Sequence, residues 1–230
     1  MINLTNFILK IIAIFTMFCD HLGYALYGKS SGFNYIGRIS FPIFAFGISE
    51  GYKHTKNKKD YCFRLLLFGV VSQAPFMFFS SIFSSSFKLN IFFTLLIGLI
   101  AIIGYEKCCE QFKNKSIGFF LVVGLACTAD FLKTDYGYFG VLMIFIFHIF
   151  KDKKWLLYIS YITLCLVKYV PLAIFTGLYI EYGLLCIWTI VPLMFIHLYN
   201  GKKGNNIKYL LYGFYPVHLI LLYVFNIIFI

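Results

Sequence analysis

The segment NFILKIIAIFTMFCDHLGYALY, at Asn6–Tyr27, is largely apolar until it reaches Asp20 and His21. A helix of about 20 apolar residues spans the hydrocarbon core of a bilayer. Eight further apolar segments follow, at residues 36–52, 61–81, 89–105, 117–132, 136–150, 155–170, 182–199 and 207–230. The sequence therefore predicts an all-α polytopic helical bundle of about nine transmembrane helices, formed by one domain over residues 1–230. The fifth, sixth and seventh segments are short, which requires less tilt, a thinner bilayer or a re-entrant segment.

Composition excludes most other classes of protein. Hydrophobic residues make up 61% of the 230 residues and charged residues 13%, against roughly 45–50% and about 25% in soluble domains. A soluble fold of this size has too little interior for so many apolar side chains. An ordinary cytosolic enzyme, a disordered chain and a secreted disulfide scaffold are thus excluded, and the continuous apolar runs disfavour a β-barrel, whose strands alternate.

The basic residues predict the orientation in the membrane. Most of the 20 Lys and Arg residues lie within residues 53–64, 107–115, 151–154 and 202–208, after every second apolar segment. Cytoplasmic loops carry such an excess, so we expect the amino terminus inside and the carboxyl terminus outside. The same pattern accounts for the net charge of +11 without nucleic acid. The seven cysteines form no C-x-x-C pair and no zinc signature is present, so we expect no metal.

Ionisable residues inside a membrane segment are functional candidates because their burial is costly. Asp20 lies roughly 21 Å along the first helix, in the outer half of the membrane, and His21 is next to it. The two form an acid/base unit if they touch. Consecutive helical residues point about 100° apart, so Asp20 alternatively holds another partner. Arg38, at the start of the second segment, either pairs with Asp20 or binds a carboxylate or phosphate.

Other polar residues lie near the two membrane surfaces or in the last segment. His218 is near the middle of that segment, where Tyr215 and Pro216 supply a hydroxyl and a kink, so we expect an internal polar site. Asn90 lies at the outer end of the fourth segment, and Asp135 in a short outer loop. A cytoplasmic polar cluster is either a solvated loop or a docking surface for a polyphosphate; it comprises Glu50, Lys53, His54 and Arg64.

Five stretches of the chain carry a family resemblance. They are KIIAIFTMFCDHLGY (10–24), IGRISFPIFAFGISEGYKHTKNKKDYCFRLL (36–66), LNIFFTLLIGL (89–99), DYGYFGVL (135–142) and KYLLYGFYPVHLILL (208–222). In these motifs and their order the sequence resembles the TraX-like family, named for the acetylase of conjugative pilin. Residues 151–200 match no motif of the family.

The resemblance implies a membrane acetyltransferase of the bacterial cytoplasmic membrane that uses acetyl-CoA as co-substrate. Its acceptor is the amino terminus of an exported peptide or pilin-like protein. The catalytic histidine of related membrane acyltransferases maps onto His21. The roles of the other motif residues are our interpretation: catalysis by Asp20, substrate binding by Arg38, Asn90, Asp135, Tyr215 and His218, and binding of the acetyl-CoA phosphates by Glu50, Lys53, His54 and Arg64.

Several alternatives stay open at the level of sequence. The acceptor is an exported peptide, or else a hydroxyl or amine of an exported sugar or lipid. Transfer is direct or passes through an acetyl-histidine, with Arg38 or Tyr215 stabilising the oxyanion. A non-enzymatic transporter with a proton relay through Asp20, Arg38 and His218 is a further hypothesis, although no internal repeat supports it. A non-catalytic membrane scaffold is the last.

Overall fold

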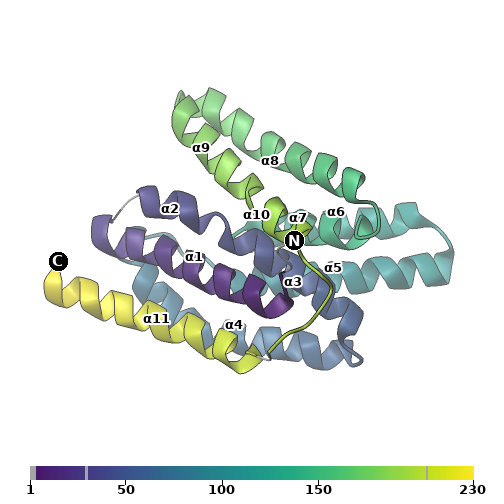
Figure 1. Cartoon of the computed structure of the whole chain (residues 1–230), viewed down its shortest axis with the longest axis horizontal. Helices are drawn as coiled ribbons and strands as arrows, with labels where there is room; N and C mark the ends of the chain where they lie inside the picture. Colours follow the sequence, from purple (N-terminus) through teal and green to yellow (C-terminus); the bar gives the residue numbers. More distant parts are fainter. Residues whose placement is uncertain (1–3, 29–30, 206) are drawn as a thin grey trace. The chain divides into compact units, whose positions relative to one another are not determined.

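The computed structural model describes residues 4–28, 31–205 and 207–230. Within these residues the chain is all-helical, with eleven helices and no strand, which confirms the all-α part of the prediction, whereas the nine spans and their orientation stay predictions (Figure 1). Two isolated parallel bridges join Leu4 to Tyr199 and Leu89 to Thr134. The helices are α1 (Asn6–Tyr27), α2 (Gly32–Gly37), α3 (Ser40–His54), α4 (Lys58–Ser80), α5 (Ile91–Phe112), α6 (Lys115–Phe131), α7 (Gly137–Ile149), α8 (Lys154–Thr176), α9 (Tyr179–Ile190), α10 (Pro192–His197) and α11 (Lys208–Phe229).

Six of the helices in the described residues are long and apolar enough to cross a membrane. They are Asn6–Tyr27, Lys58–Ser80, Ile91–Phe112, Lys154–Thr176, Tyr179–His197 and Tyr209–Phe229, and Gly137–Ile149 is a shorter apolar helix. A chain with this many apolar helices hides its backbone polar groups inside the helices, as a bilayer requires. The protein is therefore a multi-pass membrane protein.

Prolines account for two differences from the predicted segments. The sequence predicts a short helix over residues 155–170, but α8 continues through Pro171 to Thr176. Membrane helices tolerate a proline within the span. The predicted segment 182–199 is divided into α9 and α10. The division falls at Val191, and Pro192 occupies the first turn of α10, where its missing N–H costs no helical hydrogen bond.

The chain divides into two compact units. Unit 1 contains the described parts of residues 1–44, 75–85 and 158–230. In it, α1 packs against both α2 and α11 (Figure 1). Leu9 and Ala13 of α1 and Leu219 of α11 are buried in this unit. Helix α1 is thus the element that two different neighbours share. The prediction of a single domain over residues 1–230 stays a prediction.

Unit 2 contains residues 45–74 and 86–157, and its centre is the packing of α5, α6 and α7 on one another. Its core is made mostly of small and β-branched side chains: Ala101, Val122, Ala126, Ala129 and Val141, with Tyr105 and Phe145. Gly98 of α5 leaves room for the side chain of Ile144 on α7. Small residues allow this close approach, which is the usual basis of helix association in membranes.

A fully buried asparagine joins two helices of unit 2. Asn90 is the N-cap of α5, and its Oδ1 accepts a hydrogen bond of 3.0 Å from the backbone N–H of Phe92. Its Nδ2 donates to the carbonyl of Gly69 at 2.7 Å and to Oε1 of Gln73 at 2.9 Å, both on α4. The amide therefore caps one helix and fastens it to another.

We predict that Asn90→Ala destabilises the protein more than the equivalent change at Asn114. Asn114 caps α6 through a single 2.9 Å bond to the N–H of Ser116 and is exposed, so its loss costs about 1 kcal/mol. Asn90→Ala also leaves the Gly69 carbonyl without its Asn90 donor, adding about 1–3 kcal/mol. Thermal unfolding of both variants in the same detergent measures the difference, and equal midpoints would contradict the prediction.

Candidate functional site

Two histidines from distant parts of the sequence meet inside unit 1. Nδ1 of His21, on α1, lies 2.6 Å from Nε2 of His218, on α11. The two rings are stacked, with centroids 4.9 Å apart and planes 22° from parallel. On its other side, Nδ1 of His218 lies 2.7 Å from the carbonyl oxygen of Phe214, one helical turn earlier. A backbone carbonyl and two imidazole rings thus form one continuous chain of contacts.

Aromatic side chains surround this histidine pair. The ring of Phe79 meets His21 edge-on, with centroids 5.1 Å apart. Phe214 stacks on His218 at 4.5 Å, and Tyr215 lies close to both histidines, at 6.2 Å from His21 and 5.8 Å from His218. His218 and Tyr215 are buried, with 2% and 3% of their surface exposed. The pair is therefore surrounded by aromatic rings, and the two facing ring nitrogens share one hydrogen bond.

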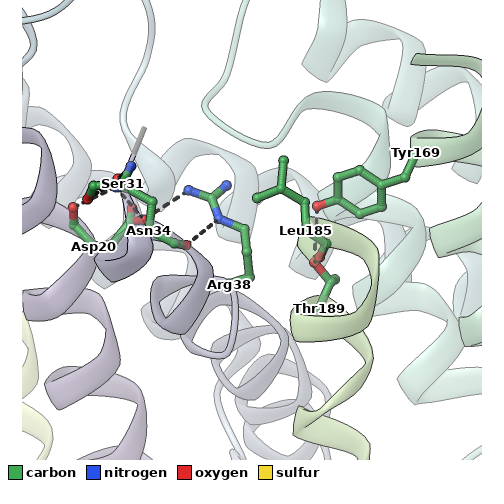
Figure 2. A network of polar contacts seen from close by, with 7 residues as sticks. All are labelled: Asp20, Ser31, Asn34, Arg38, Tyr169, Leu185 and Thr189. Atoms are coloured by element: carbon green, nitrogen blue, oxygen red, sulfur yellow. Dashed lines mark hydrogen bonds and ion pairs between the residues drawn. The ribbon is translucent and has the colours of Figure 1, made fainter. Parts of the chain in front are cut away.

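Asp20 points away from His21 and binds the α2 side of the unit. Its Oδ1 forms an ion pair with Nη2 of Arg38 at 2.9 Å, and both side chains are partly buried (Figure 2). Asn34 donates from Nδ2 to Oδ1 of Asp20 at 3.1 Å and to the Asp20 carbonyl at 2.9 Å. Of the two arrangements left open by the sequence, the structure has the pair with Arg38, and it is His218 that holds His21.

Asn34, in the short helix α2, and Arg38, its C-cap residue, also form hydrogen bonds with nearby residues of the same segment. Oδ1 of Asn34 accepts from the backbone N–H of Ser31 at 2.7 Å and from its hydroxyl at 3.0 Å. Nε of Arg38 donates to the Asn34 carbonyl at 3.2 Å, and a cation at the end of a helix also interacts favourably with the helix dipole. These contacts hold both side chains in the orientation in which they bind Asp20.

A glycine allows α2 to approach α1 at this point. A Cβ atom added to Gly37, the last residue of α2, would overlap Cβ and the carboxylate of Asp20. The Cβ of Asp20 is fixed to the backbone of α1, so it cannot rotate out of the way. Gly37 therefore sets the distance between the two helices at which Asp20 and Arg38 meet.

A second polar cluster lies on the other side of Arg38. Tyr169, on α8, has its hydroxyl 3.0 Å from Oγ1 of Thr189 on α9, and Thr189 donates to the carbonyl of Leu185 at 2.7 Å. Figure 2 shows the guanidinium of Arg38 between this cluster and the Asp20 network, and α2 contacts α9. Tyr161 donates to the Thr189 carbonyl at 2.6 Å. Helices α8 and α9 are thus joined by buried hydroxyl groups next to Arg38.

The remaining candidates belong to unit 2. Asn90 is the cap described above, and the substrate contact expected for it stays a prediction. The exposed Asp135 donates its backbone N–H to the Leu89 carbonyl at 2.9 Å. In the polar cluster predicted to be cytoplasmic, Nε2 of His54 lies 3.5 Å from Oε2 of Glu50, and Lys53 is exposed. Arg64 of this cluster lies over the ring of Tyr61 at 5.6 Å. Binding of acetyl-CoA by this cluster stays a prediction as well.

Sequence reasoning did not single out Asn34, Tyr169 or Thr189. Asn34 had a usable signal, since Ser31 and Asn34 have the spacing of a capping box at a helix start. Tyr169 and Thr189 had none, because they lie within residues 151–200, where polar side chains are scattered among many aromatic and aliphatic ones. Among the described residues, no group of three His, Cys, Asp or Glu side chains could hold a metal ion.

Fold and site together define a multi-pass helical membrane protein with a pair of histidines in contact and a neutralised Asp–Arg pair. The family model of the TraX protein matches residues 6–226, so the chain belongs to the TraX family. A probable fimbrial assembly protein FimC (serogroup H1) of Dichelobacter nodosus is 28% identical, over 96% of this chain and 95% of that protein. An uncharacterised protein of Rickettsia prowazekii (strain Madrid E) is 25% identical, over 66% of this chain and 59% of that protein. No solved structure matches.

We predict that Gly37→Ala destabilises the protein by about 1–3 kcal/mol, because overpacking forces α2 away from α1. Gly32→Ala is the matched control in the same helix, since no described atom lies within 4 Å of the added Cβ. It should leave stability unchanged or slightly raised. The thermal midpoints of the two variants in detergent test the prediction, and a Gly37 variant as stable as the Gly32 variant would contradict it.

We also predict strong energetic coupling between Asp20 and Arg38. Asp20→Asn or Arg38→Met alone leaves one partly buried charge without its partner, at a cost of about 2 kcal/mol or more. The double variant removes both charges, so it should be more stable than either single variant. Unfolding of all four proteins under one condition gives the coupling energy. Additive losses would mean that the ion pair makes no net contribution.

Proposed function

We propose that this protein is a membrane-embedded acetyltransferase that moves an acetyl group from acetyl-CoA to the amino terminus of an exported peptide or pilin-like protein. His21 acts as the general base. The observation that carries the proposal is the contact between His21 and the buried His218, in two apolar helices of a TraX family protein. Ionisable groups inside membrane helices are costly to keep, and imidazole is the side chain whose chemistry best suits taking and returning a proton.

The reaction requires one proton to be moved twice. The acceptor amine attacks the thioester carbon of acetyl-CoA as His21 takes a proton from the amine nitrogen. The new N–C bond forms, the C–S bond breaks, and the thiolate of CoA leaves with the proton that His21 returns. The products are the acetylated amine and CoA thiol. The ion pair of Asp20 with Arg38 leaves little net charge beside the base, which suits a neutral nucleophile.

Membrane topology and the cytoplasmic loops support the use of acetyl-CoA. We propose nine membrane-spanning segments, with the amino terminus in the cytoplasm and the carboxyl terminus outside. In this arrangement α3 forms the second segment, and α9 with α10 forms the eighth. The basic loops then face the cytoplasm, where Lys53 and Arg64 have the positive charge needed to attract the phosphates of acetyl-CoA. The named relative from Dichelobacter nodosus, a probable fimbrial assembly protein, is consistent with an exported subunit as acceptor.

We predict that His21→Ala lowers acetyl transfer by about 10²–10⁴-fold, the usual contribution of a general base. The assay uses proteoliposomes, acetyl-CoA labelled on the acetyl group, and a peptide with a free amino terminus. His197→Gln is the matched control: His197 is exposed and its Nδ1 contacts the hydroxyl of Tyr158, outside the site. This variant should keep the activity of the unchanged protein.

The acceptor and the alternative functions are distinguished in the same assay. A peptide with a blocked amino terminus should receive no label. Labelling of a sugar or a lipid would instead show that the acceptor is a sugar or a lipid. Full activity of the His21→Ala variant would refute the role of His21. A proton flux that depends on the protein and occurs without acetyl-CoA would instead support the transporter hypothesis.

A further inference from the structure

We propose that His218 is a positioning residue that fixes the tautomer of His21, so that Nε2 of His21 carries the lone pair that accepts the proton. The catalytic consequence rests on the proposed function, whereas the tautomer is a property of the protein alone. Two contacts fix this tautomer, the first between His218 and the backbone of α11 and the second between the two histidines.

The first contact decides where the proton of His218 lies. Nδ1 of His218 is 2.7 Å from the carbonyl oxygen of Phe214. A carbonyl oxygen only accepts hydrogen bonds. Nδ1 of His218 must therefore carry a hydrogen and donate it. In a neutral imidazole only one nitrogen is protonated, so Nε2 of His218 has a lone pair.

The second contact decides which nitrogen of His21 carries the hydrogen. Nε2 of His218 lies 2.6 Å from Nδ1 of His21, which is hydrogen-bonding distance. Because Nε2 of His218 accepts, Nδ1 of His21 must donate. The hydrogen of neutral His21 is then on Nδ1, and its Nε2 is left as the basic nitrogen.

The opposite arrangement of the hydrogens would place a positive charge on the buried His218. If His218 donated from Nε2 while still bonded to Phe214, it would be a cation. That cation would be buried to 98% between the rings of Phe18, Phe214 and Tyr215. The nearby carboxylate of Asp20 is bound to Arg38. Burial of an ion without a counter-charge is strongly unfavourable, so the neutral arrangement is the resting one.

The pair also explains how the site holds the proton during the reaction. When Nε2 of His21 takes the proton of the acceptor, Nδ1 keeps its hydrogen and donates it to Nε2 of His218 across the 2.6 Å contact. The positive charge therefore stays on His21, and it is lost when Nε2 gives its proton to the leaving thiolate. A second histidine, bonded to a backbone carbonyl, thus does the orienting work that a carboxylate does in the familiar Ser-His-Asp arrangement.

Nitrogen NMR of the unchanged protein tests the tautomer directly. The protein is labelled with ¹⁵N in its histidine rings and reconstituted in lipid bilayers. The chain has five histidines, so the signals of His21 and His218 are assigned by their loss in His21→Gln and His218→Gln. We expect both rings to be protonated on Nδ1 and unprotonated on Nε2, with a coupling across the N–H···N contact. A His21 protonated on Nε2 in the resting protein would overturn the proposal.

Two substitutions at His218 separate positioning from packing. Glutamine places an amide oxygen near the former Nε2, so His218→Gln should keep the hydrogen of His21 on Nδ1 and retain much of the activity. Methionine has similar length and only a weak acceptor. His218→Met should therefore shift His21 to the tautomer protonated on Nε2 and lower kcat by about 10²-fold, the lower end of the contribution of a general base, with KM for acetyl-CoA unchanged. His197→Gln serves as the control. An unaltered His21 tautomer in His218→Met would refute positioning by His218.

The two proposals fail in different ways. The expected tautomer without any acetyl transfer would support the positioning role and refute the proposed function. Acetyl transfer by a protein with the hydrogen of His21 on Nε2 would support the proposed acetyltransferase function and refute the role given to His218.

Discussion

The ion pair between Asp20 and Arg38 is the interaction on which the polar site of unit 1 depends. A carboxylate in a membrane helix needs a counter-charge, and the guanidinium of Arg38 supplies it at 2.9 Å. If Asp20 had taken His21 as its partner, the imidazole would have been held by an anion. The pair with Arg38 leaves His21 with a different partner, His218.

Helix geometry produces this separation. Asp20 and His21 are consecutive residues of α1, so their side chains point about 100° apart around the helix axis. One direction faces α2 and the other faces α11, and α1 packs against both helices. Gly37 allows α2 to come close enough for its polar residues to reach Asp20. On the other side, Asn226 of α11 donates to the carbonyl of Ala25 at 2.7 Å, so a second polar contact fastens α11 along α1.

Helices α8 and α9 extend the network in a region where sequence reasoning recognised no motif. Their buried hydroxyls, from Tyr161, Tyr169 and Thr189, hold the two helices together next to Arg38. Buried polar groups of this kind need partners, and here each hydroxyl has one. A segment in which the sequence showed no recognisable motif, although the family model covers it, therefore contributes to the surroundings of the arginine that neutralises Asp20.

The sequence by itself determined the helical class, the membrane character, the family and most members of the polar site, because each depends on composition, on the length of apolar segments or on rare ionisable residues within them. It left the partner of Asp20 open and gave His218 no partner, because 197 positions separate His218 from His21 and nothing in the local pattern relates α1 to α11. Only the tertiary structure decided that Arg38 binds Asp20, that His218 meets His21, and that Asn90 serves as a cap. Such pairings follow from which helices pack together, and helix packing is a property of the whole chain rather than of any segment in it.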